Sequence, residues 1–109
     1  MKIKLGLGNL VTYTFNPTAK TLAVSGAYNF DIEPQSLEVY DGTLSAYIYG
    51  GNSTATATVA RTYSPAALPL QTVTFDKVPA GAASGDSLAV YCEVSDDVAI
   101  FNALTHLLP

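Results

Sequence analysis

Three acidic residues, Asp31, Glu33 and Asp41, come closest in this sequence to a metal-binding set. Carboxylate oxygens are the ligands that calcium prefers, but the spacing of these three matches no EF-hand loop. Pro34 and an expected strand also separate Asp41 from the other two. We therefore interpret these carboxylates as turn and cap residues, and we expect no metal ion and no other cofactor.

The sequence has one cysteine, Cys92, and one histidine, His106. Cys92 lies in an alternating apolar segment, where a cysteine behaves as a small hydrophobic residue, and no base is near it in sequence. His106 falls in an expected terminal helix, with no identifiable catalytic partner. The chain has no GxSxG motif, no phosphate-binding loop and no paired-carboxylate motif. These observations predict a protein that is not an enzyme and has no catalytic residue.

Tyrosine is the one residue type that suggests binding, since the chain has seven tyrosines and no tryptophan. Exposed tyrosines are common at protein interfaces and also stack on sugars. They can equally fill the half-buried rim of a β-sandwich. All three interpretations stay open, and a sugar site would lie near Gly50, Gly51 and Asn52. The tyrosines are Tyr13, Tyr28, Tyr40, Tyr47, Tyr49, Tyr63 and Tyr91.

Length and charge restrict the class of protein further. The 109 residues fit one domain, 1–109. Charged residues make up 13%, the net charge is −4, and the five cations are scattered, so nucleic acid is not an expected partner. No apolar run approaches the roughly 18 residues of a membrane span. Gly6, Gly8 and Asn9 interrupt the position of a signal-peptide apolar region, so we do not expect secretion by the usual route.

The elements expected to position these residues are short strands. Alternation over 11–15 and 20–25, joined by the turn 16–19, predicts a β-hairpin. Further strands are expected over 37–40, 44–49, 54–63, 70–75 and 87–94, the last of them central. Tyr47 and Tyr49 are expected on one strand face, and Pro65 and Pro69 predict a loop over 64–69. The fold class is an all-β sandwich, immunoglobulin-like or jelly-roll-like, with about seven or eight strands.

Both ends of the chain carry apolar rows. Residues 1–8 are interpreted as a first strand or as an arm that pairs with another subunit. Ser95 and two aspartates predict a helix start, so a short helix is expected over 96–109. The segment 54–63 has no strongly apolar face, which is typical of an edge strand or of one covered from outside the chain. We expect a homo-oligomer whose interface includes Ile3, Leu5, Leu7, Tyr47, Tyr49, Tyr63, Phe101, Leu104 and Leu108.

The hairpin resembles a small β-module of bacteriophage structural proteins. Its sequence runs FNPTAKTL over 15–22, then Ser-Gly at 25–26 and Asn-Phe-Asp-Ile at 29–32. A Ser-Gly-Asp turn at 84–86 leads into the last strand in a similar way. The resemblance covers 11–41 well and 72–91 loosely, and it does not cover 42–71 or the terminal helix.

The resemblance implies a virion component: a capsid-associated, vertex or spike, neck or tail module, made in the host cytoplasm. Such a module acts by packing against copies of itself and against other virion proteins. The motif is a turn-and-core pattern, so it carries over no catalytic residue. The alternative function is a carbohydrate-binding or host-recognition β-module.

Overall fold

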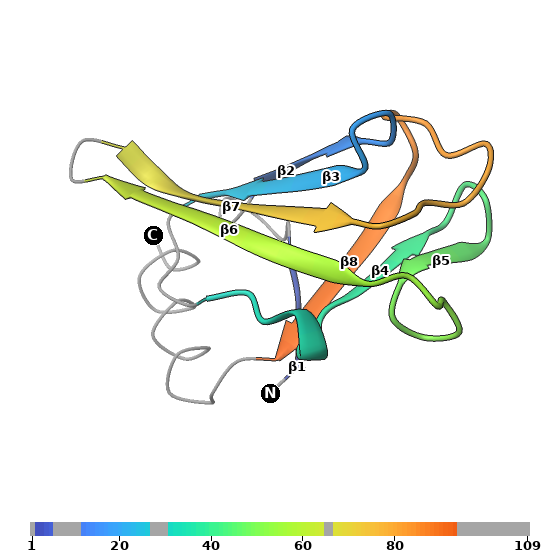
Figure 1. The fold of residues 1–109 in the computed structure, drawn as a ribbon, viewed down its shortest axis with the longest axis horizontal. Helices are drawn as coiled ribbons and strands as arrows, with labels where there is room; N and C mark the ends of the chain where they lie inside the picture. Colours follow the sequence, from blue (N-terminus) through green and yellow to red (C-terminus); the bar gives the residue numbers. More distant parts are fainter. Residues whose placement is uncertain (1, 6–11, 27–30, 65–66, 94–109) are drawn as a thin grey trace, which may run out of the picture.

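The computed structural model of this protein describes residues 2–5, 12–26, 31–64 and 67–93. In these ranges the chain forms two antiparallel four-stranded sheets that pack together, so the expected all-β sandwich is confirmed (Figure 1). The elements are β1 (Lys2–Lys4), β2 (Thr12–Asn16), β3 (Thr21–Ser25), the 3-10 helix η1 (Pro34–Ser36), β4 (Glu38–Asp41), β5 (Ala46–Tyr49), β6 (Ala57–Ser64), β7 (Ala67–Phe75) and β8 (Leu88–Glu93).

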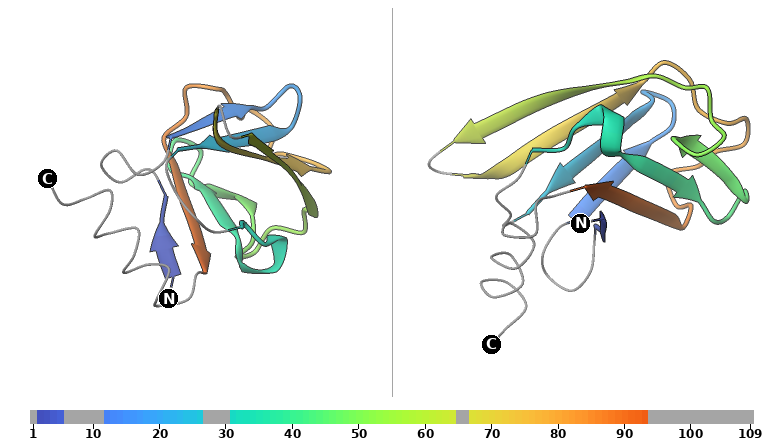
Figure 2. Two further views of the ribbon diagram at one scale, coloured as in Figure 1. Left: turned by 90° about the vertical axis from the view of Figure 1, so that its left-hand side faces the viewer. Right: turned by 90° about the horizontal axis from the view of Figure 1, so that it is seen from below.

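The two sheets are built alike. Sheet A has the strand order β1-β8-β4-β5, and sheet B has the order β2-β3-β7-β6. Sheet B joins the hairpins β2–β3 and β6–β7 through its inner strands, and sheet A joins the hairpin β4–β5 to the pair β8–β1 in the same way. Figure 2 shows the sheets as two layers. Because β1 and β2 lie in different sheets, the order differs from an immunoglobulin constant domain, whose first two strands pair.

The predicted hairpin is confirmed as β2 and β3, which pair from Thr12 with Ser25 to Asn16 with Thr21. The Asn16 side chain holds the turn, because its Oδ1 accepts a hydrogen bond from the Ala19 N–H at 3.1 Å. Lys20 completes the turn with a φ of 59°. Its carbonyl accepts the Phe75 N–H at 2.9 Å, which ties the turn to the end of β7.

The core lies between the sheets and is formed by the inward positions of the alternating strands. Sheet B, sheet A and the segment that connects β3 to β4 all contribute to it. The buried apolar residues are Leu5, Phe15, Leu22, Val24, Ile32, Leu37, Val39, Ile48, Val73, Phe75, Leu88, Val90 and Cys92. The period-2 pattern read from the sequence therefore assigns most inward positions correctly.

The expected loop over 64–69 is wrong at its end, because β7 already begins at Ala67 and includes Pro69. A proline lacks the N–H that an interior ladder requires. This part of β7 pairs only with β6, since the pairing of β3 with β7 stops at Leu70. The β6–β7 register is also irregular between Thr62 and Ser64, so the ladder tolerates the proline there.

The expected shared face of Tyr47 and Tyr49 is also wrong. Tyr40 pairs with Tyr47 while the preceding Val39 pairs with Tyr49, so β5 uses one residue more than β4 between the two pairs. This β-bulge places Ile48 in the core at 1% exposure and turns the two tyrosines to opposite sides of the sheet. Sequence alternation alone does not report an inserted residue.

The first predicted strand is confirmed at Lys2–Lys4, which pairs with β8 of the same chain. β8 lies between β1 and β4, so its expected central position is also confirmed. Phe30, residues 6–8 and Val94 lie outside the described residues, as does the expected helix over 96–109.

Cys92 provides a test of the inward assignment of β8. The residue is 1% exposed, and burial raises the pKa of its thiol to about 11, so little of the reactive thiolate forms near neutral pH. We expect a thiol reagent to label native protein at pH 7.5 far more slowly than protein unfolded in urea. Cys92→Ala should lower the free energy of unfolding by on the order of 1 kcal/mol through a small cavity. Equal labelling rates in the two states would contradict the assignment.

Candidate functional site

The connection from β3 to β4 crosses between the sheets and is held by two side chains at Ile32. Ile32 is fully buried. Its N–H donates to Gln71 Oε1 at 2.7 Å, and its carbonyl accepts from Arg61 Nη2 at 2.6 Å. Arg61 and Gln71 are paired residues on β6 and β7. Two neighbouring side chains of sheet B therefore satisfy both backbone groups of one crossing residue, much as a paired strand would. We call this arrangement the Ile32 clip.

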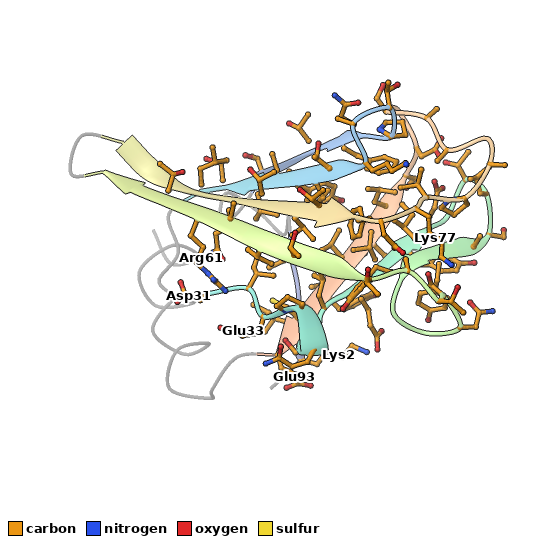
Figure 3. All side chains as sticks on the ribbon, viewed as in Figure 1. Lys2, Asp31, Glu33, Arg61, Lys77 and Glu93 are labelled. Atoms are coloured by element: carbon orange, nitrogen blue, oxygen red, sulfur yellow. The ribbon has the colours of Figure 1, made fainter. Side chains whose placement is uncertain are left out.

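Two of the carboxylates considered for calcium lie beside the clip (Figure 3). Arg61 Nε lies 3.6 Å from Asp31 Oδ1, and Arg61 Nη2 lies 3.4 Å from Glu33 Oε1. Both carboxylate side chains are about half exposed. Asp41 ends β4 instead and accepts hydrogen bonds from its own turn. No group of three or more potential ligands gathers anywhere in the described ranges. Asp31 and Glu33 thus lie together beside Arg61, and Asp41 serves a separate turn.

Sequence reasoning missed Gln71 and placed Arg61 on a strand face without a role for it. The signal was present, because Gln71 alternates with Val73 and Phe75 on the inward face of β7. A polar residue at a core position requires a buried partner. The partner is an irregular segment about 40 residues earlier in the chain, and no local pattern identifies it.

The outer face of sheet A is charged and aromatic. Lys2 donates to Glu38 at 2.8 Å, and this hydrogen bond raises the pKa of the lysine. The Lys2 ammonium also lies 5.3 Å from the centre of the Tyr91 ring. Tyr40 and Tyr47 meet edge to face on the same side, with ring centres 5.0 Å apart. Such a mixture of charges and rings is typical of a solvated face.

The outer face of sheet B is different, because its outward positions form an uncharged grid of three rows across four strands. No position in the grid is Asp, Glu, Lys or Arg, and each is exposed or half-exposed. We call this surface the neutral face. Its rows are Thr12, Ser25, Leu70 and Thr62; then Thr14, Ala23, Thr72 and Ala60; then Asn16, Thr21, Thr74 and Thr58.

The composition of the neutral face goes beyond strand propensity. Threonine is favoured in strands, so its abundance there is ordinary. The twelve adjacent positions carry no charge at all, in a chain in which 13% of the residues are charged. Small side chains also let another surface approach the sheet closely. The neutral face is therefore the best candidate for a contact surface in the described part of the chain.

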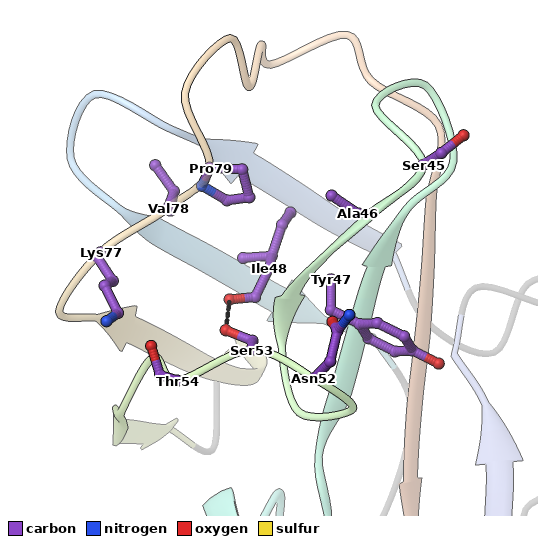
Figure 4. A pocket seen from close by; sticks show the side chains of 10 residues that line it. All are labelled: Ser45, Ala46, Tyr47, Ile48, Asn52, Ser53, Thr54, Lys77, Val78 and Pro79. Atoms are coloured by element: carbon purple, nitrogen blue, oxygen red, sulfur yellow. Dashed lines mark hydrogen bonds between the residues drawn. The ribbon is translucent and has the colours of Figure 1, made fainter.

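A shallow hollow of about 370 Å³ lies where β5 and the segment 52–54 face residues 77–79 (Figure 4). Ile48, Val78 and Pro79 line its apolar part, while Asn52 and Lys77 are among its polar groups. Ser53 donates from Oγ to the Ile48 carbonyl at 3.2 Å and fixes the loop at its edge. The structure thus brings Tyr47 and Asn52, both considered for sugar binding, to one place.

The Tyr47 ring is not a platform over this hollow. Figure 4 shows it turned away from Lys77 and Pro79. A β-carbon at Gly51 would lie only 2.7 Å from the ring, so the glycine backbone lies directly against it. Because Gly51 and Tyr40 already contact the ring, little aromatic surface is left to stack on a sugar.

Several residues expected at a partner interface instead pack against other residues of the same chain. Leu5 is 1% exposed, and Ile3 is half-buried against the core. Tyr49 packs against Phe75 and donates from its hydroxyl to the Pro34 carbonyl at 2.7 Å. Tyr47 is half-exposed on sheet A. Outside the described residues or side chains lie Leu7, Tyr63, Phe101, Leu104 and Leu108.

Comparisons of the chain with family models, with curated proteins and with solved structures found no match. In the part of the chain that the structure describes, no helix is long and apolar enough to cross a membrane. The interpretation of the surfaces therefore depends on their chemistry and on the resemblance of the hairpin.

The Ile32 clip predicts an order of stability losses. Gln71→Met keeps length and volume but leaves the buried Ile32 N–H unpaired, which should cost about 1–3 kcal/mol of unfolding free energy. Arg61→Met should cost less, because the Arg61 side chain is 28% exposed and water can reach the Ile32 carbonyl in its place. Urea unfolding measures both variants.

Thr74→Met, on the exposed face of the same strand as Gln71, is the matched control and should change stability by about 0.5 kcal/mol or less. A loss for Arg61→Met equal to that of Gln71→Met would contradict this account of the clip.

Proposed function

We propose that this protein is a non-enzymatic structural protein of a bacteriophage virion, which acts by packing against copies of itself and against other virion proteins. It would be made in the host cytoplasm and then built into the particle as a capsid-associated, vertex, spike, neck or tail module. The resemblance of the hairpin to phage β-modules supports this proposal. The turn of that hairpin is held by Asn16, whose Oδ1 accepts the Ala19 N–H.

The observation that carries the proposal is the neutral face. Copies of a chain with net charge −4 repel one another, and an uncharged surface is where two copies approach with the least repulsion. The other outer face carries Lys2, Glu38 and Glu93, whose charges favour solvent. We therefore propose that a neighbouring copy packs on the neutral face.

Strand β6 supports the same location. It is an edge strand of eight residues, and its only charged side chain, Arg61, reaches to the Ile32 carbonyl. Edge strands usually carry charges, especially lysines, that hinder pairing with other chains. An edge without that protection fits a strand that a neighbour covers.

The size of the neutral face implies that a single contact is weak. Four strands about 4.8 Å apart and three rows of residues make a face on the order of 400 Å². A stable complex buries roughly 800 Å² on each partner. Pairs should therefore form only at high concentration in solution, while a particle would reinforce each contact through many simultaneous neighbours.

We expect the average solution mass of the full chain to rise above that of a single chain as concentration increases from about 10 μM to about 1 mM. Ala60→Arg, which puts a long cation into the neutral face, should keep the protein monomeric over that range. Sedimentation equilibrium or light scattering measures both, and circular dichroism checks that the variant is folded.

Ala80→Arg is the matched control, because it makes the same substitution at an exposed loop residue outside the neutral face. It should associate like the unmodified chain. A chain that stays monomeric at 1 mM, or equal association of the two arginine variants, would contradict packing on the neutral face. Absence of the chain from purified particles by mass spectrometry would contradict the virion assignment.

The second candidate function is carbohydrate binding or host recognition at the hollow beside β5. Its support is the position of Asn52 and Lys77 around an apolar floor, which is a common arrangement in small-ligand sites. If it holds, the isolated protein should bind a glycan on an array, and Asn52→Ala should remove the signal while Ser84→Ala, in an exposed turn, should not. No binding to any glycan would exclude this candidate.

A further inference from the structure

Two carboxyl groups meet at the end of sheet A where β4 leaves the sandwich. Asp41 is fully buried, and its Oδ1 accepts the N–H groups of Thr43 and Leu44, both at 3.0 Å. Its other oxygen, Oδ2, is buried and has no conventional donor within reach in the described part of the chain. The Asp86 carboxyl is the charged side chain that acts on Asp41 at this junction. Asp86 in turn accepts the Ala83 N–H with its Oδ2 at 3.0 Å.

Hydrogen bonds between two turns bring the residues that carry these carboxyl groups to one junction. The turn 42–45 and the turn that precedes β8 are bonded to each other, because the Gly42 N–H donates to the Ser87 carbonyl at 2.8 Å. The Ser87 N–H donates in turn to Thr43 Oγ1 at 2.9 Å. Asp41 and Asp86 directly precede the two residues of the first bond, so their side chains are held at the same junction.

Two neighbouring ionised carboxylates repel each other strongly when one of them is buried, so they do not both persist without a compensating positive charge. The compensation must be a proton or a cation. The buried Oδ2 of Asp41 is sealed from solvent and has no donor among the described residues, and a proton on it would have the Asp86 carboxylate as its acceptor. A hydrated metal ion needs several water ligands, whereas a proton needs no room. The geometry therefore favours the proton.

We propose that Asp41 and Asp86 share one proton, and that the resulting hydrogen bond is a pH-sensitive latch that holds the 42–45 turn against the 83–87 turn. The protonated carboxyl donates its O–H to the ionised one, and the amides of Thr43, Leu44 and Ala83 stabilise the negative charge of the pair. When the proton leaves, both groups are negative and the two turns are pushed apart.

The other groups around Asp41 do not replace the proton. Its cross-strand neighbours, Leu88 on β8 and Ala46 on β5, are uncharged. Within the described residues, Asp86 is the charged neighbour that acts on Asp41, and Lys77 lies across the hollow that Ala46 lines. The pair is thus a local device at one end of the sandwich.

The sign of the pH effect follows from the direction of the shift. Burial raises the pKa of Asp41, the contact with Asp86 raises it further, and the two amide hydrogen bonds oppose this. A group whose pKa is higher in the folded state contributes stability that is complete below its unfolded pKa, near 3.9. That contribution is lost as pH rises through the folded pKa. The latch should therefore be closed in mild acid and weakened toward neutral and alkaline pH.

The test is the melting temperature from pH 4 to pH 9 of the full chain, Asp41→Asn, Asp86→Asn and the double variant. In Asp41→Asn the amide oxygen still accepts the two N–H groups, and the amide nitrogen donates permanently to Asp86. We expect each single variant to melt higher than the unmodified protein above the pKa of the pair, with a difference that grows with pH. The double variant should gain no more than either single variant, because one neutral partner already removes the repulsion.

Asp76→Asn is the matched control, since Asp76 also accepts a backbone N–H, that of Thr56 at 2.7 Å. Its difference from the unmodified protein should stay the same at every pH. Single variants whose difference is independent of pH, or gains that add in the double variant, would overturn the shared proton. A melting temperature that rises with added Ca²⁺ or Mg²⁺ in the unmodified protein, but not in Asp41→Asn, would also overturn it in favour of a bridging cation.

Discussion

The sandwich depends on how the chain crosses from sheet B to sheet A between β3 and β4. An irregular segment that enters a core brings backbone N–H and carbonyl groups that no ladder satisfies, and each unpaired buried group is costly. At Ile32 a glutamine and an arginine from adjacent strands replace the missing ladder. The isoleucine side chain then packs in the core, and the chain continues to β4, which pairs with β8. This residue therefore contributes to the core and to the connection between the two sheets.

The same crossing separates two surfaces with different properties. Arg61 is the only charged residue of β6, and it is turned under the sheet toward Ile32 and the acidic connector. Arg61 lies at an inward position of β6, between the outward positions Ala60 and Thr62 that contribute to the neutral face. Sheet A keeps its charges outside, in the contacts of Lys2 with Glu38 and Tyr91.

Local patterns predicted the elements of this fold but not the points where distant segments meet. The hairpin, the inward positions of β7 and β8 and the Asp41 turn follow from alternation and turn chemistry, which act over a few residues. The bulge at Ile48 and the strand through Pro69 depend on the exact register with the preceding hairpin strand, which the local sequence does not report, so they look like ordinary alternation and an ordinary breaker. The neutral face emerges only when the register aligns four strands, each of which contributes three of its residues. The Asp41–Asp86 contact likewise joins two turns that each look complete alone.

Polar contacts flank strand β4 on both sides, and the two sets differ in how they respond to pH. Before the strand, at Ile32, the partners are an amide and a guanidinium, neither of which changes charge between pH 4 and pH 9. At the end of the strand, burial and the contact with Asp86 raise the pKa of Asp41. A rise in pH therefore leaves the crossing at Ile32 intact and loosens the turns around Asp41. In a module that packs against neighbours through sheet B, such a change would act on the opposite sheet and on the rim of the hollow, without altering the neutral face.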